Sequence, residues 1–136
     1  TSVYFDGSIQ QATSGSYSKS HLFLQADVYG DFLQEQIYLD QNTLHVFNNQ
    51  TKLYTYQFSN KISQAAFPLK IDANTEGLGV VSNLNNQFYM FDRRGKIMLD
   101  FPIPGNAKPS VYQTKDKAYL FILSKEGVIF TYQTQF

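Results

Sequence analysis

The sequence predicts an all-β fold made of antiparallel four-stranded repeats. Three observations predict it: short stretches in which apolar and polar residues alternate, Asn, Gly and Asp between those stretches, and two landmarks that recur about every 44 residues. Alternation with a period of two is typical of strands whose two faces differ, and Asn, Gly and Asp favour tight turns. Apolar residues at helical spacing extend over no more than a turn or two. The chain is therefore expected to consist of strands and turns.

The first landmark is a hairpin-like stretch that sets the length of the repeat. The landmark occurs as VFNNQTKLY at 46–54 and as MFDRRGKIM at 90–98. Each copy begins with an apolar residue, Phe, and then Asn or Asp. Three polar residues, a Lys and another apolar residue follow. Leu53 and Ile97 hold the same place in these copies and lie 44 residues apart. VYFDGSI at 3–9 is a shorter copy, at another step of 44 residues. This spacing indicates copies of one structural unit.

The second landmark is an extended run that is closed by Asp. It occurs as LFLQAD at 22–27, FPLKID at 67–72 and VYQTKD at 111–116, at steps of 45 and 44 residues. Two independent landmarks with one period predict a repeat architecture rather than a chance likeness.

Each repeat is expected to hold four short strands. In the best-preserved repeat the expected strands are about 22–26, 36–40, 43–47 and 52–58. In the next repeat they are about 67–71, 78–82, 87–91 and 96–101. In the last, incomplete repeat they are about 110–113, 119–123 and 128–132. Four antiparallel strands in roughly 40–50 residues make one blade of a β-propeller, in which radially stacked sheets cover one another's faces.

Residues 1–136 are interpreted as a single β-repeat domain of about three blades. The expected repeat phases are about 1–21 (partial), 22–66, 67–110 and 111–136 (partial). Known propeller rings have four or more blades. The chain is therefore expected to be a fragment of a larger protein or to pair with a second copy. A β-sandwich or a curved repeat stack is the alternative, and in every case exposed strand edges favour pairing.

Several of these stretches resemble repeats of known families. LHVFNNQTKLY (44–54) and FYMFDRRGKIMLDFPI (88–103) resemble the strand–turn–strand of bacterial β-propeller repeats of the quinoprotein-like and WD40-like group. ADVYGDFLQEQIYL (26–39) resembles the loop of FG-GAP and VCBS-type repeats, in a degenerate form. The chain lacks Trp, and with it both the Trp-Asp dipeptide of WD40 blades and a ring to stack on a quinone. Quinone chemistry is therefore not implied.

The FG-GAP resemblance implies a calcium site in the first loop. In that family, side-chain oxygens at loop positions 1, 3, 5 and 9 and a carbonyl at position 7 surround Ca²⁺, a hard cation that prefers oxygen ligands. Asp27, Asp31 and Glu35 match three of these positions. Tyr29 stands at position 3, and Phe32 replaces the glycine of the turn. The alternative to a calcium site is that this loop is a solvent-exposed connection between two strands, in which Asp only forms the turn.

The second repeat carries a related stretch, DANTEGLGV, at 72–80. Asp72, Asn74 and Glu76 match the first three ligand positions, but Val80 replaces the last ligand. The third repeat has no such loop after Asp116. Asp27, Asp72 and Asp116 could line one rim of the molecule, or each could simply form a turn after its strand.

Composition argues against several functions. The net charge is zero and no long basic tract occurs, so no nucleic-acid footprint is visible. The chain has no Cys, and its longest apolar run, residues 118–123, is far too short to insert into a membrane. His21 and His45 belong to no catalytic motif. The sequence therefore predicts no enzyme.

The expected function is that of a non-enzymatic β-propeller-type binding or scaffolding module. The partner would be another protein, or a second copy that pairs through strand edges. The resemblances imply an exported bacterial protein and an extracytoplasmic location. One alternative is a calcium-dependent adhesion or carbohydrate-binding module, with sugar stacking on some of the 10 Tyr residues. The other is an accessory domain of a larger enzyme.

Overall fold

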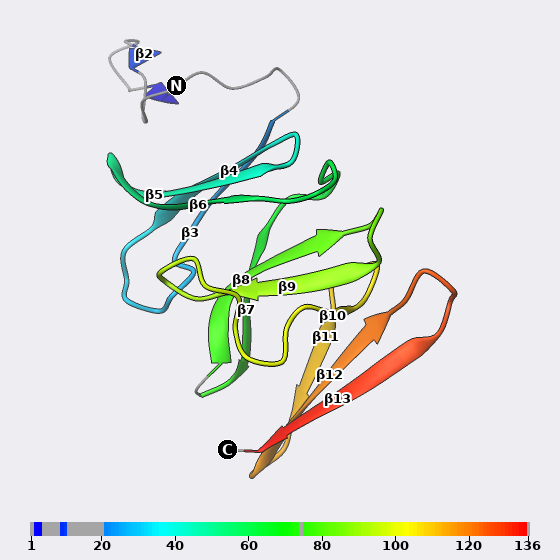
Figure 1. Ribbon diagram of the computed structural model, residues 1–136. Coiled ribbons are helices and arrows are strands. Elements are labelled where there is room, and N and C mark those ends of the chain that lie inside the picture. The colour runs from blue at the N-terminus through cyan, green and yellow to red at the C-terminus, as the bar shows by residue number, and fades with distance from the viewer. Residues whose placement is uncertain (1, 4–8, 11–20, 74, 136) are drawn as a thin grey trace.

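The computed structural model describes residues 2–3, 9–10, 21–73 and 75–135, and their regular structure is entirely β (Figure 1). The first sheet contains β3 (Leu22–Ala26), β4 (Glu35–Asp40), β5 (Thr43–Asn48) and β6 (Thr51–Gln57). The second sheet contains β7 (Phe67–Asp72), β8 (Thr75–Ser82), β9 (Gln87–Phe91) and β10 (Ile103–Pro104). The third sheet contains β11 (Ser110–Gln113), β12 (Lys117–Leu123) and β13 (Ile129–Gln135). β1 (Ser2–Val3) and β2 (Ile9–Gln10) form a short separate pair.

Each of the three sheets is an antiparallel meander whose strands follow chain order. The prediction of an all-β chain built from such units is confirmed. β3, β7 and β11 open the three sheets where the second landmark recurs. The described residues form no closed ring, and most of the expected first phase, residues 1–21, lies outside them. The described residues also contain no helix that is long and apolar enough to cross a membrane.

The predicted strand at 96–101 is wrong. Ile97 forms only an isolated bridge with Phe91, and the fourth strand of the second sheet is the two-residue β10. Pro102 and Pro104 lack the N–H group that a strand needs to donate to its neighbour, so a long regular strand is not favoured here. The hairpin resemblance of the first landmark therefore extends to the turn but not to the strand that follows it.

The second sheet is buried on both faces because it lies between the other two (Figure 1). Side chains alternate along β8, so that Leu78 and Val80 join one apolar cluster and Val81 joins the other. The cluster shared with the first sheet includes Ile37, Leu39, Leu44, Val46, Leu78, Val80 and Phe91. The cluster shared with the third sheet includes Phe67, Ile71, Val81, Phe88, Met90, Ala118, Leu120 and Ile122. Both clusters are needed to cover this one sheet.

A row of asparagines joins the three sheets at one end. We call the turn residues Asn83, Asn85 and Asn86 between β8 and β9, with Asn60 and Asn106, the asparagine seam. Its hydrogen bonds run from Asn60 Nδ2 to Asn85 Oδ1 (2.6 Å), from Asn83 Nδ2 to the Asn106 carbonyl (2.7 Å) and from the Lys125 N–H to Asn86 Oδ1 (2.8 Å). Asn60 follows the first sheet, and Lys125 lies in the turn between β12 and β13. Polar bonds therefore supplement the apolar clusters in holding the sheets together.

The turn after β9 packs directly under the first sheet. Gly95 has a φ of +82°, and a Cβ atom added to it would lie 2.5 Å from Cγ of Tyr54 on β6. The Tyr54 ring is in turn stacked with Phe91, at 6.3 Å between centroids. Only a residue without a side chain allows this close approach.

Gly95→Ala is expected to destabilise the protein by about 3 kcal/mol, from about 1 kcal/mol for the positive φ and about 2 kcal/mol for overpacking. Gly127→Ala is the matched control, because Gly127 has a φ of +81° but no atom within 4 Å of an added Cβ. It is expected to cost only about 1 kcal/mol. Urea unfolding measures both variants, and equal losses would contradict the packing of Tyr54 against this turn.

Candidate functional site

The loop between β3 and β4, which we call the acidic loop (residues 27–35), is closed by Asp27. Its carboxylate accepts hydrogen bonds from the N–H groups of Gly30 (2.8 Å), Asp31 (3.2 Å) and Phe32 (2.8 Å). Partial burial of this carboxylate would raise its pKa, but the backbone donors outweigh that effect and hold the pKa of Asp27 below its ordinary value. The turn-forming role predicted for Asp27 is confirmed.

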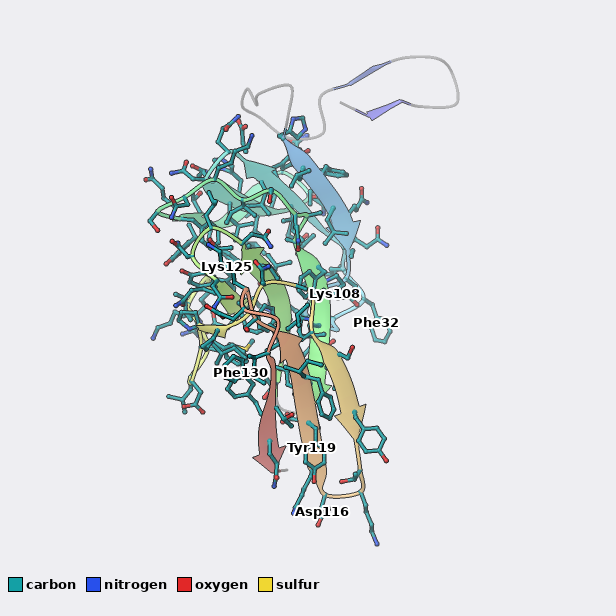
Figure 2. All side chains as sticks on the ribbon, turned by 90° about the vertical axis from the view of Figure 1, so that its right-hand side faces the viewer. Phe32, Lys108, Asp116, Tyr119, Lys125 and Phe130 are labelled. Atoms are coloured by element: carbon teal, nitrogen blue, oxygen red, sulfur yellow. The ribbon has the colours of Figure 1, made fainter. Side chains whose placement is uncertain are left out.

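Phe32 has a φ of 65° at the position where the resembling family has glycine. Its side chain is 95% exposed and points away from the molecule (Figure 2). The loop therefore has a left-handed residue at this turn without a glycine.

Asp31 connects the acidic loop to the second sheet. One of its oxygens accepts the Leu33 N–H at 3.0 Å, and the other lies 3.2 Å from Arg93 Nη2. The Arg93 guanidinium also lies over the Tyr29 ring, 5.7 Å from its centroid. Arg93 belongs to the turn that follows β9. Because the ion pair is partly exposed, it contributes only about 0.2–1 kcal/mol.

Tyr29 occupies the third ligand position of the loop, but its side chain is used for packing. The Tyr29 hydroxyl donates to the Asp92 carbonyl at 2.9 Å and lies 2.6 Å from the Tyr54 hydroxyl. Since the single Tyr29 proton is donated to Asp92, Tyr54 acts as the donor in the second bond. Burial raises the pKa of both phenols. Both tyrosines therefore stay neutral, and the Tyr29 hydroxyl attaches the loop to the turn that follows β9 of the second sheet.

Glu35 is the buried member of the acidic loop, with only 1% of its surface exposed. Its Oε1 accepts the Val28 N–H at 3.0 Å, and Asn48 Nδ2 donates to Oε2 over a long 3.5 Å. Burial raises the pKa of Glu35, the Val28 N–H lowers it, and the charges of Asp31 and Asp27 raise it further. The net effect is a raised pKa, because burial and like charges disfavour the carboxylate.

The structure brings together the three acidic residues that the sequence singled out in the first loop. Carboxylate oxygens of Asp27, Asp31 and Glu35 all lie within 4.8 Å of one another, and no other group of this kind occurs among the described residues. Oxygen donors at such spacing suit a hard divalent cation. The same oxygens are already used by backbone N–H groups and by Arg93, so the loop also closes on its own bonds.

The second predicted ligand set is not gathered in a loop. β7 and β8 form a tight hairpin in which Asp72 ends one strand and pairs with Thr75, and Glu76 lies within the other. Asn74 lies outside the described residues. β8 begins at Thr75 rather than at the expected residue 78, so no room for a separate loop remains.

Glu76 instead lies beside the first loop, a position that no pattern in the sequence indicated. A Cβ atom added to Gly30 would lie 3.1 Å from Glu76 Oε2. The contact depends on how the first two sheets stack, and no local pattern encodes that stacking.

The other sequence candidates lie in strands. His45 is on β5, opposite Tyr38 and Thr55, within the strand expected at 43–47. Burial and the charge of Lys52 lower the pKa of His45. Several strand tyrosines pack in the core, for example Tyr56 against Tyr89 with centroids 6.2 Å apart. These rings take part in aromatic packing between the sheets.

Comparison of the chain with protein family models, with curated proteins and with solved structures gives no match. The likeness to propeller repeats therefore stays a prediction that depends on the residues of the sequence.

Glu35→Gln is expected to change how stability depends on pH. Because the folded protein raises the pKa of Glu35, this group stabilises the fold fully below its ordinary value of 4.5 and loses that contribution as the pH rises through the raised pKa. Urea unfolding between about pH 4 and pH 7 should therefore show wild type losing stability relative to Glu35→Gln. Asp27 acts in the opposite direction but is present in both proteins. Parallel pH curves for the two proteins would contradict the raised pKa.

Proposed function

We propose that the chain is a non-enzymatic β-repeat module of the β-propeller type, and that it binds protein through the surfaces of its sheets. Three successive antiparallel sheets open at residues 22, 67 and 110, which supports a blade-like repeat. The middle sheet is covered on both faces, as blades within a propeller are. The third sheet has one covered face and one face that is not.

The uncovered face of the third sheet carries this proposal. Residues directly opposite each other on antiparallel strands point to the same side of a sheet. Tyr112 on β11 is opposite Tyr119 on β12, and Leu123 on β12 is opposite Ile129 on β13. We define the outer face as Tyr112, Tyr119, Phe121, Leu123 and Ile129. Figure 2 shows the three strands side by side, with Tyr119 labelled.

The outer face is apolar and accessible. Tyr112 is 60% exposed and Ile129 is 65% exposed, and Phe121 and Leu123 are also exposed. Contiguous exposed apolar side chains of this kind often mark an interaction surface. Thr131 and Gln133 lie opposite Phe121 and Tyr119, and Lys117 precedes Tyr119 by two residues, so these polar residues border the apolar patch on the same side of the sheet.

The sequence of β12 also indicates that both faces of this strand are meant to be buried. The run AYLFIL at 118–123 is apolar at every position. In a strand with one solvent-exposed face, apolar and polar residues alternate instead. Ala118, Leu120 and Ile122 are buried against the second sheet. Tyr119, Phe121 and Leu123 point the other way and have no covering among the described residues.

We assign a second copy of the chain as the partner on this face. The chain already packs sheet on sheet twice, so its sheets have the twist and spacing that such packing needs. The net charge of zero means that two copies do not repel each other. A dimer through the outer face would give the third sheet a neighbour on both sides, as the second sheet has.

Analytical ultracentrifugation over a concentration series tests this assignment. Wild type is expected to reach twice the 15.6 kDa of the chain, whereas Phe121→Lys and Ile129→Lys should stay monomeric because each would bury an unpaired charge. Thr55→Lys is the matched control, since Thr55 is exposed on β6 of the first sheet and should not affect association. A wild type that stays monomeric at high concentration, or a loss of association with Thr55→Lys alone, would overturn the assignment.

A calcium-dependent module is the second candidate function, and the convergence of Asp27, Asp31 and Glu35 favours it. Calcium at about 10 mM, in excess over the Kd of weak extracellular sites, should then raise the melting temperature relative to a chelator. Asp31→Asn should abolish the shift. Asp116→Asn, in the exposed turn between β11 and β12, should retain it. Identical melting with calcium and with chelator would eliminate this candidate.

A further inference from the structure

The third sheet has a free edge at the position where the other two sheets carry a fourth strand. β6 pairs with β5 in the first sheet, and β10 pairs with β9 in the second. In the third sheet β13 pairs with β12, and no described residue pairs with its other edge. The fold therefore shows what kind of element belongs beside β13, namely an antiparallel strand.

The hairpin geometry shows which backbone groups this edge offers. The Ser124 N–H donates to the Val128 carbonyl at 2.8 Å, which closes the turn between β12 and β13. Hydrogen-bonded pairs alternate along an antiparallel ladder, so Phe130 and Tyr132 bond to β12. Ile129, Thr131 and Gln133 consequently point their N–H and carbonyl groups outward. These outward groups are spaced to bond to an added strand.

Nothing in the sequence of β13 protects this edge. Edge strands usually carry a charged residue or a Pro that prevents pairing with other chains. β13 reads IFTYQTQ and has neither, whereas β6 contains Lys52 and β10 contains Pro104. The edge is therefore suited to pairing.

A cavity of about 390 Å³ opens beside this edge, between the second and third sheets. Its apolar wall is formed by Ile71, Leu99, Phe101, Ile103, Leu120 and Tyr132. Leu99 is 88% exposed at the mouth, where the exposed Asp100 is the only charged lining residue. The volume falls within the range of pockets that bind ligands, roughly 300–1,000 Å³. A large apolar side chain would fill part of it.

We propose that β13 binds an extended segment of another polypeptide as a fourth strand, and that an apolar side chain of this segment enters the cavity. Residues of the added strand that face the same side as Phe130 and Tyr132 would point toward the second sheet. The preferred segment thus has large apolar residues at every second position and a Lys or Arg near Asp100. This proposal rests on the proposed protein-binding function and names the class of ligand.

A peptide with the sequence of β6 and its next residue, TKLYTYQF, is the probe. It serves as the fourth strand of the first sheet, places Tyr54, Tyr56 and Phe58 on one side, and includes Lys52. Fluorescence anisotropy with a labelled peptide should give a Kd on the order of micromolar to tens of micromolar. The same peptide with N-methyl groups on the bonding edge should bind at least about tenfold more weakly, because its hydrogen bonds are lost.

Thr131→Pro is the decisive variant of the protein. The Thr131 N–H points away from β12, so Pro leaves the fold intact but removes a donor from the edge, and peptide affinity should fall about tenfold. Thr131→Val, which keeps the N–H, is the matched control and should bind as wild type does. Leu99→Ala, which removes part of the cavity wall without touching the edge, should weaken binding about threefold to tenfold.

Equal binding of the plain and N-methylated peptides, or equal binding by wild type and a folded Thr131→Pro, would overturn the proposal. Phe121→Lys changes the outer face and is expected to leave peptide affinity unchanged. A Phe121→Lys protein that no longer dimerises but still binds the peptide would therefore show that the two interfaces are separate. If wild type binds the peptide but stays monomeric, strand addition at β13 is supported and the outer-face dimer is refuted.

Discussion

The structure depends on one constraint: a sheet that is apolar on both faces must have a neighbour on each side. β8 shows the constraint most clearly, since Leu78 and Val81, which point in opposite directions, are both fully buried. A four-stranded antiparallel sheet cannot shield two such faces by itself. The first and third sheets supply the cover, and the asparagine seam and the bond from the Tyr29 hydroxyl to the Asp92 carbonyl hold them in place. The stacking order, the loop contacts and the uncovered outer face all follow from this requirement.

Local pattern was sufficient to predict most of the strands. Alternation and turn residues located β5 and β9 within a residue, because a hairpin is specified by neighbours in sequence. The short β10 was missed because Ile97 and Met98 have the composition of a strand, while the prolines that follow prevent a regular ladder. The early start of β8 was missed because Asp72, Asn74 and Glu76 resembled loop residues, although a two-residue turn is enough to reverse the chain.

The candidate site shows the same division between local and long-range information. Spacing within one loop predicted that Asp27, Asp31 and Glu35 would lie together. The second sheet supplies the ion pair of Arg93, the hydrogen bond that holds Tyr29 and the nearby carboxylate of Glu76. Residue spacing within the loop carries no information about these contacts. The incomplete last repeat, with three expected strands instead of four, did predict the free edge of β13. The cavity beside this edge was not predicted, because its walls come from two sheets. The unbroken apolar run of β12 is typical of a strand covered on both faces.

The asparagine seam has a consequence for the chemical lifetime of the protein. Asn83 Nδ2 donates to both the carbonyl and the side-chain oxygen of Asn106, at 2.7 and 2.9 Å. Asparagine is among the residues that degrade on heating. Slow hydrolysis of this amide would leave a carboxylate that faces two oxygen acceptors, so attraction between the second and third sheets would become repulsion at that point. A chemical change at this one amide would thus weaken a joint of the fold while every strand of the chain was still intact.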